Sequence, residues 1–325
     1  MVGVVEGVGM RAVVLAVWML GVAGAQTRVP VWIDTDPSVA PGGHEVDDGL
    51  ALLQAFASPE LEIRGVSIVF GNAELATASR IGREIVGRFG PKGMAVHDGA
   101  AGESDLGKET AASRALAAEL RRGPLTVLVL GPGTNVATVV RQHPELVGRI
   151  ERVVAVAGRR PGQSFRAGPR QKTPFRDLNF ELDPEAFRVL LAARVPLVLA
   201  PWEISSGVWL TRGELETAAK RNVGMEWMLP ALVDWIELWE REFGAEGFNP
   251  FDALAVGYLV KPGSLECSRM RARVEKAADD TGASDRKPYL LVGAARGGGE
   301  EVTYCSVAKP EFKSDLLRRL SGERR

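Results

Sequence analysis

Four aspartates are gathered near the start of the chain. Asp34 and Asp36 lie in an Asp-Thr-Asp-Pro run, and Asp47 and Asp48 follow a loop that bears glycine and proline. Ionised carboxylates this close in sequence repel one another unless protons or a cation neutralise them. Oxygen-only ligands suit Ca²⁺ or Mg²⁺ better than Zn²⁺. The cluster therefore predicts a hard-cation site, with capping of a helix by one aspartate as the alternative.

The segments on either side of this cluster predict a strand and a helix. Residues 29–33 are a short β-branched run that contains a proline, which is typical of a buried strand. Residues 48–56 carry apolar side chains at helical spacing, and the second aspartate pair lies at the start of that helix. Strand, acidic loop and helix would bring both pairs together.

Strand-like runs alternate with helical stretches from residue 29 to about residue 200. The predicted strands cover residues 31–33, 63–70, 94–97, 125–130, 152–157 and 195–200, and the predicted helices 73–89, 111–121, 136–141 and 184–193. Residues 210–243 are also helical in pattern, and the tail adds short strands at 289–292 and 301–307 and a helix from 310. This pattern predicts an α/β fold: a single domain with a mostly parallel sheet and helices on both faces.

Polar residues follow several of the predicted strands. They are Asp34, Asp36, Asn72, Asp98, Asn135 and Glu203. Open parallel sheets bind ligands outside the carboxyl ends of their strands, so we expect these residues to share one rim. The irregular loop 158–173 is expected to shape or cover the pocket there. Trp235 and Trp239 share one helical face, which suits either core packing or stacking on a nucleobase or sugar.

The charge balance excludes one class of partner. The 325 residues include 40 Lys and Arg against 41 Asp and Glu, which gives a formal net charge of -1. Such a chain has no basic field to hold the phosphates of a nucleic-acid polymer. Its 46% hydrophobic content is enough for a sizeable core.

The N-terminus has the pattern of a secretory signal. Arg11 precedes an uncharged apolar run that ends in small residues at Ala25, and polar residues follow. The run is shorter than the ~20 residues of a membrane-spanning helix, and its end matches a cleavage site. We expect a signal peptide at residues 1–25, a mature domain at residues 26–325, and an exported, periplasmic or secreted protein without stable membrane insertion. An uncleaved membrane anchor is the alternative.

The chain contains two cysteines, Cys267 and Cys305. They could pair in an exported protein, but the sequence does not show that their Cα atoms come within bridging distance. We expect two separate buried thiols, with a disulfide as the alternative.

Five separated segments, in order, resemble motifs of the inosine-uridine nucleoside hydrolase family over about residues 29–320. The Asp-x-Asp-Pro run with its later Asp-Asp pair resembles the opening motif, and residues 65–72 resemble the second strand and its Gly-Asn. The other matches are the glycine-rich Thr-Asn turn at 131–135, the Asn and Asp-Pro-Glu-Ala at 179–186, and the late aspartate motif at 251–256. The resemblance implies a nucleoside hydrolase-like, Rossmann-like fold and a homo-oligomer, dimer or tetramer.

The resemblance also implies a reaction, hydrolysis of the N-glycosidic bond of a ribonucleoside to free base and ribose by a water bound to Ca²⁺. By position, Asp36 would be both a calcium ligand and the general base. Asp48 would be a bidentate ligand, Asp252 the remote carboxylate ligand, and Leu130 a ligand through its backbone carbonyl. Such an ion lowers the pKa of its water, and negative charge stabilises an oxocarbenium-like transition state.

The substrate contacts follow from the same resemblance. Asp47 and Asn179 would hydrogen-bond ribose hydroxyls, and Asn72 would lie near the water and the metal. Asp177 stands where the family commonly has a glutamate on the sugar, so its reach is shorter. Asp34 is expected to support the loop.

Two departures from the family pattern affect these expectations. The loop 38–46 is several residues longer than the shortest form in the family, and we expect it to fold outward and leave both aspartate pairs in place. Phe251 stands at a substrate-contacting position where many members have a histidine thought to protonate the leaving base. Activation of the base would then come from stacking, with Trp235 and Trp239 as candidate partners, from another proton donor, or from a substrate with a better leaving group.

Two other functions remain as alternatives. One is a non-catalytic, calcium-dependent nucleoside or sugar binding protein of the same fold, which the missing histidine and the export signal favour. The other is an Asp-x-Asp phosphatase with Asp34 as nucleophile. That chemistry also needs a late lysine and a later acidic motif, and the pair Asp47 and Asp48 comes too early for it.

Overall fold

A computed structural model describes residues 1–3, 28–293 and 298–323 of the chain. The signal peptide expected at residues 1–25 lies outside the described residues except for its first three, so it stays a prediction. None of the helices in the described ranges is long and apolar enough to cross a membrane.

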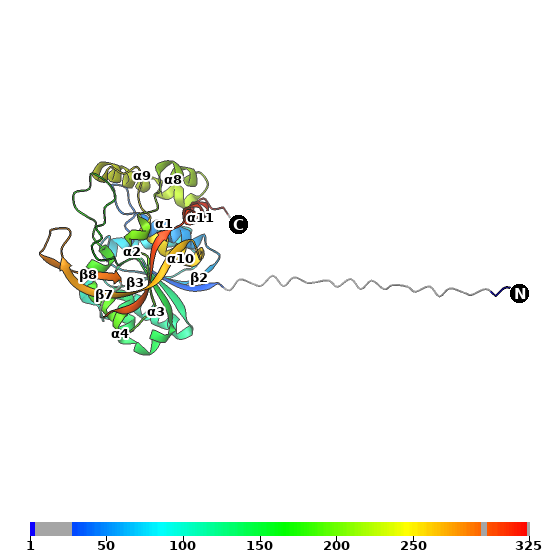
Figure 1. The fold of residues 1–325 in the computed structure, drawn as a ribbon, viewed down its shortest axis with the longest axis horizontal. Coiled ribbons are helices and arrows are strands. Elements are labelled where there is room, and N and C mark those ends of the chain that lie inside the picture. The colour runs from blue at the N-terminus through cyan, green and yellow to red at the C-terminus, as the bar shows by residue number, and fades with distance from the viewer. Residues whose placement is uncertain (4–27, 294–297, 324–325) are drawn as a thin grey trace.

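One sheet of nine strands runs through the molecule (Figure 1). The strands are β1 (Val29–Thr35), β2 (Leu61–Ile68), β3 (Val96–Asp98), β4 (Leu125–Val129), β5 (Ile150–Ala155), β6 (Leu197–Leu199), β7 (Leu265–Ala278), β8 (Arg286–Gly293) and β9 (Glu300–Ala308). Their order is β3-β2-β1-β4-β5-β6-β9-β7-β8. All pairs from β3 to β9 are parallel, whereas β7 is antiparallel to β9 and β8. The predicted mostly parallel sheet is confirmed.

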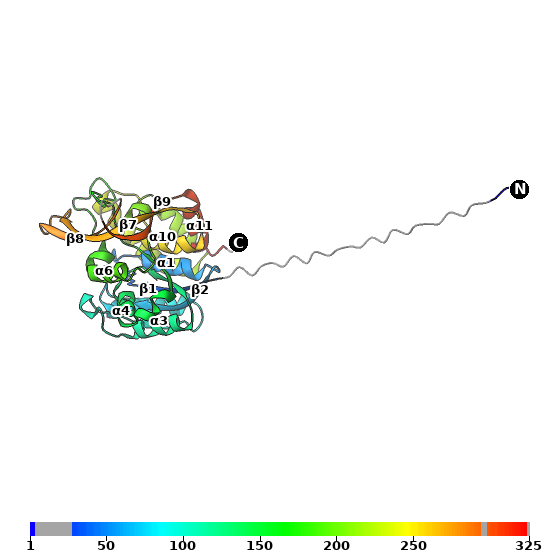
Figure 2. The ribbon, with the colours of Figure 1, turned by 60° about the horizontal axis from the view of Figure 1, so that its bottom comes forward.

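Helices cover both faces of this sheet, with α3 and α4 on one side and α1, α10 and α11 on the other (Figure 2). The helices are α1 (Asp47–Phe56), α2 (Leu75–Phe89), α3 (Ala111–Arg122), α4 (Thr134–Gln142), α5 (Leu178–Leu182), α6 (Pro184–Ala192), α7 (Trp202–Ser205), α8 (Arg212–Ala219), α9 (Val223–Phe243), α10 (Phe251–Val260) and α11 (Pro310–Leu320). On β1, Val31 and Ile33 join one buried core, and Trp32 between them joins the other. Alternate strand residues point to opposite faces, so both faces are apolar and need a helical cover.

Local signals set where the helices begin. Asp183 caps α6, because its carboxylate accepts the backbone N–H of Ala186 at 3.0 Å. Asn222 caps α9 by accepting the N–H of Gly224 at 2.8 Å. The helical stretch expected at residues 210–243 is therefore divided into α8 and α9.

The sequence pattern does not predict the length of β7. Short strands alone were expected in the tail, yet β7 spans 14 residues. Most of its side chains are at least partly exposed, because β7 lies near one edge of the sheet. Such a strand lacks the strict apolar alternation that marks a half-buried one.

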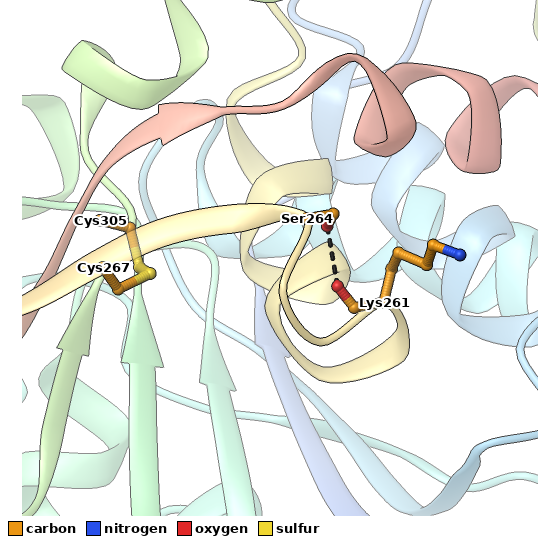
Figure 3. The surroundings of a disulfide bond; sticks show 4 residues. All are labelled: Lys261, Ser264, Cys267 and Cys305. Atoms are coloured by element: carbon orange, nitrogen blue, oxygen red, sulfur yellow. Dashed lines mark hydrogen bonds between the residues drawn. A yellow bond between two sulfur atoms is a disulfide. The ribbon is translucent and has the colours of Figure 1, made fainter.

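The two cysteines form a disulfide between β7 and β9 (Figure 3). The expectation of separate buried thiols is wrong, because Cys267 and Cys305 face each other in the antiparallel register with their Cα atoms 3.9 Å apart. In the turn before β7, the Ser264 hydroxyl donates to the Lys261 carbonyl at 2.8 Å. The disulfide covalently links β7 to β9, and few side chains of β7 are buried in the apolar cores.

A buried arginine ties the C-terminal helix to a distant part of the chain. Arg319 on α11 is 1% exposed. Its guanidinium donates to Glu60 at 2.8 and 2.9 Å, to Asp315 at 2.6 Å and to Ser58 at 2.9 Å. A buried guanidinium is costly unless paired and hydrogen-bonded, and these contacts satisfy it. Helix α11 is thereby fixed to the start of β2.

Candidate active site

A cavity of about 510 Å³ opens at the carboxyl ends of the parallel strands. Asn72, Leu130, Val156 and Trp202 line it, and they follow β2, β4, β5 and β6. This edge is where open α/β sheets bind ligands, and the volume suits a small molecule. Two groups of side chains dominate the site. The acidic group is Asp36, Glu45, Asp47, Asp48 and Asp252, and the aromatic group is Phe165, Phe175, Trp202, Trp235, Trp239 and Phe251.

The acidic group assembles because β1 ends where α1 begins. Asp47 and Asp48 occupy the first turn of α1, where the helix dipole favours negative charge. The Asp48 carboxylate accepts the Asp36 backbone N–H at 3.1 Å and a hydrogen bond from the Thr35 hydroxyl. Asp252, in the first turn of α10, reaches the same place, within hydrogen-bonding distance of Asp48. Asp48 and Asp252, 204 positions apart in the chain (252 − 48), thus share one small buried volume.

The carboxylate of Asp36 is held at the centre of this group. Its Oδ2 accepts the backbone N–H of Asn72 at 2.7 Å, whereas its Oδ1 is buried without a hydrogen-bond partner. Two glycines make room for it. A Cβ added at Gly71 would lie 1.9 Å from Oδ2, and one added at Gly131 would lie 2.6 Å from Oδ1. A buried carboxylate oxygen without a donor needs a physical explanation, and a bound cation is one that suits its acidic surroundings.

Burial and mutual repulsion dominate the electrostatics of the acidic group. Desolvation raises the pKa of Asp36, Asp47 and Asp252 well above its usual value, and the neighbouring aspartates raise it further. Desolvation also raises the pKa of Asp48. Among the described residues that line the cavity, Arg176 is the only basic one, and it pairs with Glu181 at 3.0 Å. Within the described lining of the cavity no side-chain cation neutralises the group, so its chemistry fits a hard metal ion.

Asp34 has the supporting role expected of it. Its Oδ1 accepts from Ser67 at 2.5 Å and from the Asn135 amide at 2.8 Å. The Trp32 indole N–H donates in turn to Ser67 at 2.7 Å. Burial raises the pKa of Asp34 to about 7. This chain of bonds joins β1, β2 and the start of α4 beneath the cavity.

The remaining predicted contacts lie along the cavity wall. Asn179 donates to the carbonyls of Leu130 at 2.5 Å and Val156 at 3.1 Å. The Leu130 carbonyl, expected as a metal ligand, is therefore already an acceptor and keeps one lone pair. Asp177 accepts the backbone N–H of Gly158 at 2.8 Å, and burial raises its pKa to about 6.

Of the six residues expected at the rim, only Asn72 lines the cavity. Asp34, Asp36 and Asn135 are buried, and Asp98 and Glu203 make contacts elsewhere. Asp98 pairs with Arg83 at 2.7 Å. Glu203 accepts from Tyr304 at 2.8 Å and from Gln163 at 2.7 Å. The carboxylates of Asp98 and Glu203 are engaged in these structural contacts, so for them the rim expectation is wrong.

The aromatic group forms the apolar part of the site. Phe165 and Trp202 stack with ring centroids 4.9 Å apart. Trp239 is 1% exposed, and its ring contacts those of Phe175, Trp209, Trp235, Phe243, Phe248 and Phe251. Trp235 is half-buried and lines the same cavity. Trp239 therefore acts mainly as the centre of a packed cluster, and Trp235 presents more free surface to a ligand.

Comparison with known protein families identifies the family to which this chain belongs. The sequence profile of the inosine-uridine preferring nucleoside hydrolase family matches residues 31–304. The chain belongs to this family. It is accordingly a nucleoside hydrolase by family, an enzyme acting on N-glycosyl bonds.

Individual relatives of this nucleoside hydrolase agree with the assignment. The pyrimidine-specific ribonucleoside hydrolase RihA of Salmonella agona is 26% identical, covering 72% of this chain and 80% of that protein. An uncharacterized Schizosaccharomyces pombe protein is 25% identical over a match that covers 89% of this chain and 97% of that protein. A solved plant nucleoside hydrolase, PpNRh1, matches with a TM-score of 0.75 at 19% identity, covering 90% of this chain and 99% of that one. The purine-preferring ribonucleoside hydrolase of Gardnerella vaginalis matches at 0.72, with 19% identity and coverage of 90% and 98%. The solved structures share the fold.

The nucleoside hydrolase site also contains residues that the sequence did not single out. Phe165 lies in the loop 158–173, which was expected to shape the pocket and does so. Phe175 and Trp202 lie beyond that loop and after β6. Glu45 comes from the inserted loop 38–46, and its only signal was its position two residues before Asp47.

Proposed function

We propose that the chain hydrolyses the N-glycosidic bond of a ribonucleoside and releases free base and ribose. The observation that carries the proposal is the unpartnered Oδ1 of Asp36, a buried carboxylate oxygen among the carboxylates of Asp47, Asp48 and Asp252. The family supplies the reaction class, and the cavity has the volume of a small-molecule site.

We infer that the acidic group binds Ca²⁺. Asp36, Asp48 and Asp252 would hold it with carboxylate oxygens, and the free lone pair of the Leu130 carbonyl would complete the protein ligands. The donors are all oxygen and are not neutralised by a side-chain cation, which suits this ion. When bound, Ca²⁺ lowers the pKa of a water and orients it.

The side chains of the chain perform the remaining steps. Asp36 takes a proton from the attacking water, with its carboxylate held by the N–H of Asn72. Asp47 and Asn179 bind ribose hydroxyls, and Asp177 contacts the sugar with a shorter reach than a glutamate. The negative charge of the acidic group stabilises the positive charge that develops on the sugar as the base leaves.

The leaving base is activated by stacking in this proposal. Phe251 has no proton to donate, so the base must gain its stabilisation elsewhere. A base that takes a proton from solvent is a cation, and a cation over an aromatic face is stabilised. We infer that Trp235 provides this face, because it lines the cavity and is only half-buried.

A single assay tests the reaction and the ion together. Purified protein is incubated with a panel of purine and pyrimidine nucleosides, with and without a calcium chelator, and reducing sugar is measured. We expect ribose release that the chelator abolishes and added Ca²⁺ restores. Tight nucleoside binding by calorimetry with no ribose release would contradict the proposal and favour a non-catalytic binding protein.

We further propose that the protein is exported and assembles as a dimer or tetramer. The disulfide between Cys267 and Cys305 supports export, because disulfides persist in oxidising compartments. N-terminal sequencing of the mature protein is expected to begin at Gln26, and cell fractionation to find it outside the cytoplasm. Retention of the full N-terminus in the membrane fraction would indicate an uncleaved anchor.

A further inference from the structure

The inserted loop 38–46 does not simply fold outward, as the sequence led us to expect. Its middle residues, 41–44, are largely exposed, whereas its two ends are mostly buried. The loop contacts α9 through the Gly42 N–H, which donates to Asp234 at 2.7 Å. From there the chain returns to the site and places Glu45 on the cavity wall. The insertion therefore brings a side chain to the acidic group.

Glu45 makes two contacts with predicted site residues. Its Oε2 accepts from the Asn72 amide at 3.0 Å, and the same amide donates to Asp48 at 3.2 Å. Its Oε1 accepts the backbone N–H of Asp47. Carboxylate oxygens of Glu45, Asp47 and Asp48 lie within 4.8 Å of one another, close enough to hold one ion.

An independent observation on the neighbouring Asp36 also points to a cation at this cluster. The Oδ1 of Asp36 is fully buried and has no hydrogen-bond partner, although Asn72 holds the other oxygen of that carboxylate. Asn72 thus touches Asp36, Asp48 and Glu45. Glu45 is the fifth carboxylate of the acidic group. It adds negative charge close to the proposed cation position, and its hydrogen bond fixes the side-chain amide of Asn72.

We propose that Glu45 is an added carboxylate of the cation site, which positions Asn72 and raises the affinity for the ion through its negative charge. This inference rests on the proposed function for the identity of the ion. It differs from the family-derived ligand set, because Glu45 belongs to the loop that lengthens this chain relative to the shortest family form.

Calcium binding without substrate tests this role. The full chain is stripped of metal with a chelator and titrated with CaCl₂ by calorimetry, with the calcium-induced rise in Tm as a second measurement. Glu45→Gln and Glu45→Ala are expected to bind calcium about tenfold more weakly, the size of effect seen when a partner of metal ligands is lost. The rise in Tm shrinks accordingly. Glu45→Asp keeps the charge and is expected to stay closer to the unaltered protein than Glu45→Gln.

The control is His44→Ala, an exposed position in the same loop, which should leave calcium affinity unchanged. Glu45→Gln retains an acceptor oxygen, so an unchanged affinity in that variant would show that Glu45 only fastens the loop and would overturn the proposal. An equal loss in His44→Ala would overturn it too. Unaltered protein that binds calcium but releases no ribose contradicts the proposed function and leaves this inference standing, whereas no calcium binding at all overturns both.

Discussion

Glu45, Asp47 and Asp252 of the acidic group line the same cavity as the aromatic group, but the two groups are built in opposite ways. The acidic group joins buried carboxylates that repel one another, and an oxygen of Asp36 has no partner. The aromatic group joins rings that pack against one another, with Trp239 almost fully enclosed. The acidic group should therefore cost stability when no cation is bound, whereas the aromatic group should supply it.

The contrast predicts that substitutions in the acidic group and in the aromatic group affect activity and stability differently. Replacing a repelling carboxylate should remove activity and leave the metal-free fold as stable as before or more so. Replacing an enclosed ring should reduce stability first and activity only as a consequence. Each of the following variants tests that distinction.

The largest effect is expected for Asp36→Asn. Loss of the general base and of a ligand should lower kcat by at least about 10³-fold. In chelated protein at neutral pH the same variant should melt no lower than the unaltered chain, because it removes one buried repelling charge. Ribose release and thermal melting measure the two effects. An active variant would show that Asp36 is not the general base. A large fall in Tm would contradict the prediction that the acidic group costs stability when no cation is bound.

Gly131→Ala tests how closely the Asp36 carboxylate must be placed. The new Cβ would lie 2.6 Å from its Oδ1 and 2.7 Å from a methyl of Val69. Displacement of the carboxylate should lower kcat about 10²-fold and also reduce Tm. Gly87→Ala on α2 is the matched control, because nothing lies within 4 Å of its added Cβ. That change should leave activity intact and stabilise the helix by about 0.5–1 kcal/mol.

Trp239→Ala and Trp235→Ala separate the packed ring from the accessible one. Trp239→Ala should reduce the free energy of unfolding by about 3–5 kcal/mol, because it empties the centre of a ring cluster. Trp235→Ala should change stability by about 1 kcal/mol or less and weaken substrate use about tenfold through lost stacking. Denaturant unfolding measures the change in stability of each variant, and kcat/KM measures the change in its substrate use. Equal effects on both quantities in the two variants would show that the rings act as one unit.

Asp177→Asn is expected to change the pH dependence of stability. The folded pKa of Asp177, about 6, lies above its unfolded value of 3.8, so its contribution to stability is full below the lower value and is lost as pH rises to about 6. Asparagine still accepts the Gly158 N–H. The variant should gain on the order of 2 kcal/mol at pH 7.5 and show a flatter profile between pH 4 and 6. A profile unchanged from that of the unaltered chain would contradict this.

The parts of the site that the sequence predicted are those encoded locally. Asp36, Asp47 and Asp48 stand beside a strand and a helix whose patterns are clear, so their meeting follows from the strand–loop–helix order. Asp252 could be assigned through the family resemblance alone, because nothing near it in the chain points to a remote carboxylate partner. The parallel sheet followed from the alternation of strands and helices.

The parts that the sequence did not predict depend on contacts between distant residues. Glu45 reaches the site because its loop bonds to Asp234 on α9, which lies 192 residues from Gly42. The disulfide depends on a register shift in β7 just before Cys267, which sets that residue opposite Cys305. Neither a loop path nor a strand register can be read from local propensity.

The ion-pair cluster around Arg319 bears on how this chain is made. It joins the last helix to Ser58, which is synthesised 261 residues earlier. Contacts between residues so far apart in the chain slow folding, because loop-closure entropy is lost before the contacts form. Truncations that remove the last turn of α11, and Arg319 with it, should therefore leave a chain that is made but does not reach a stable fold.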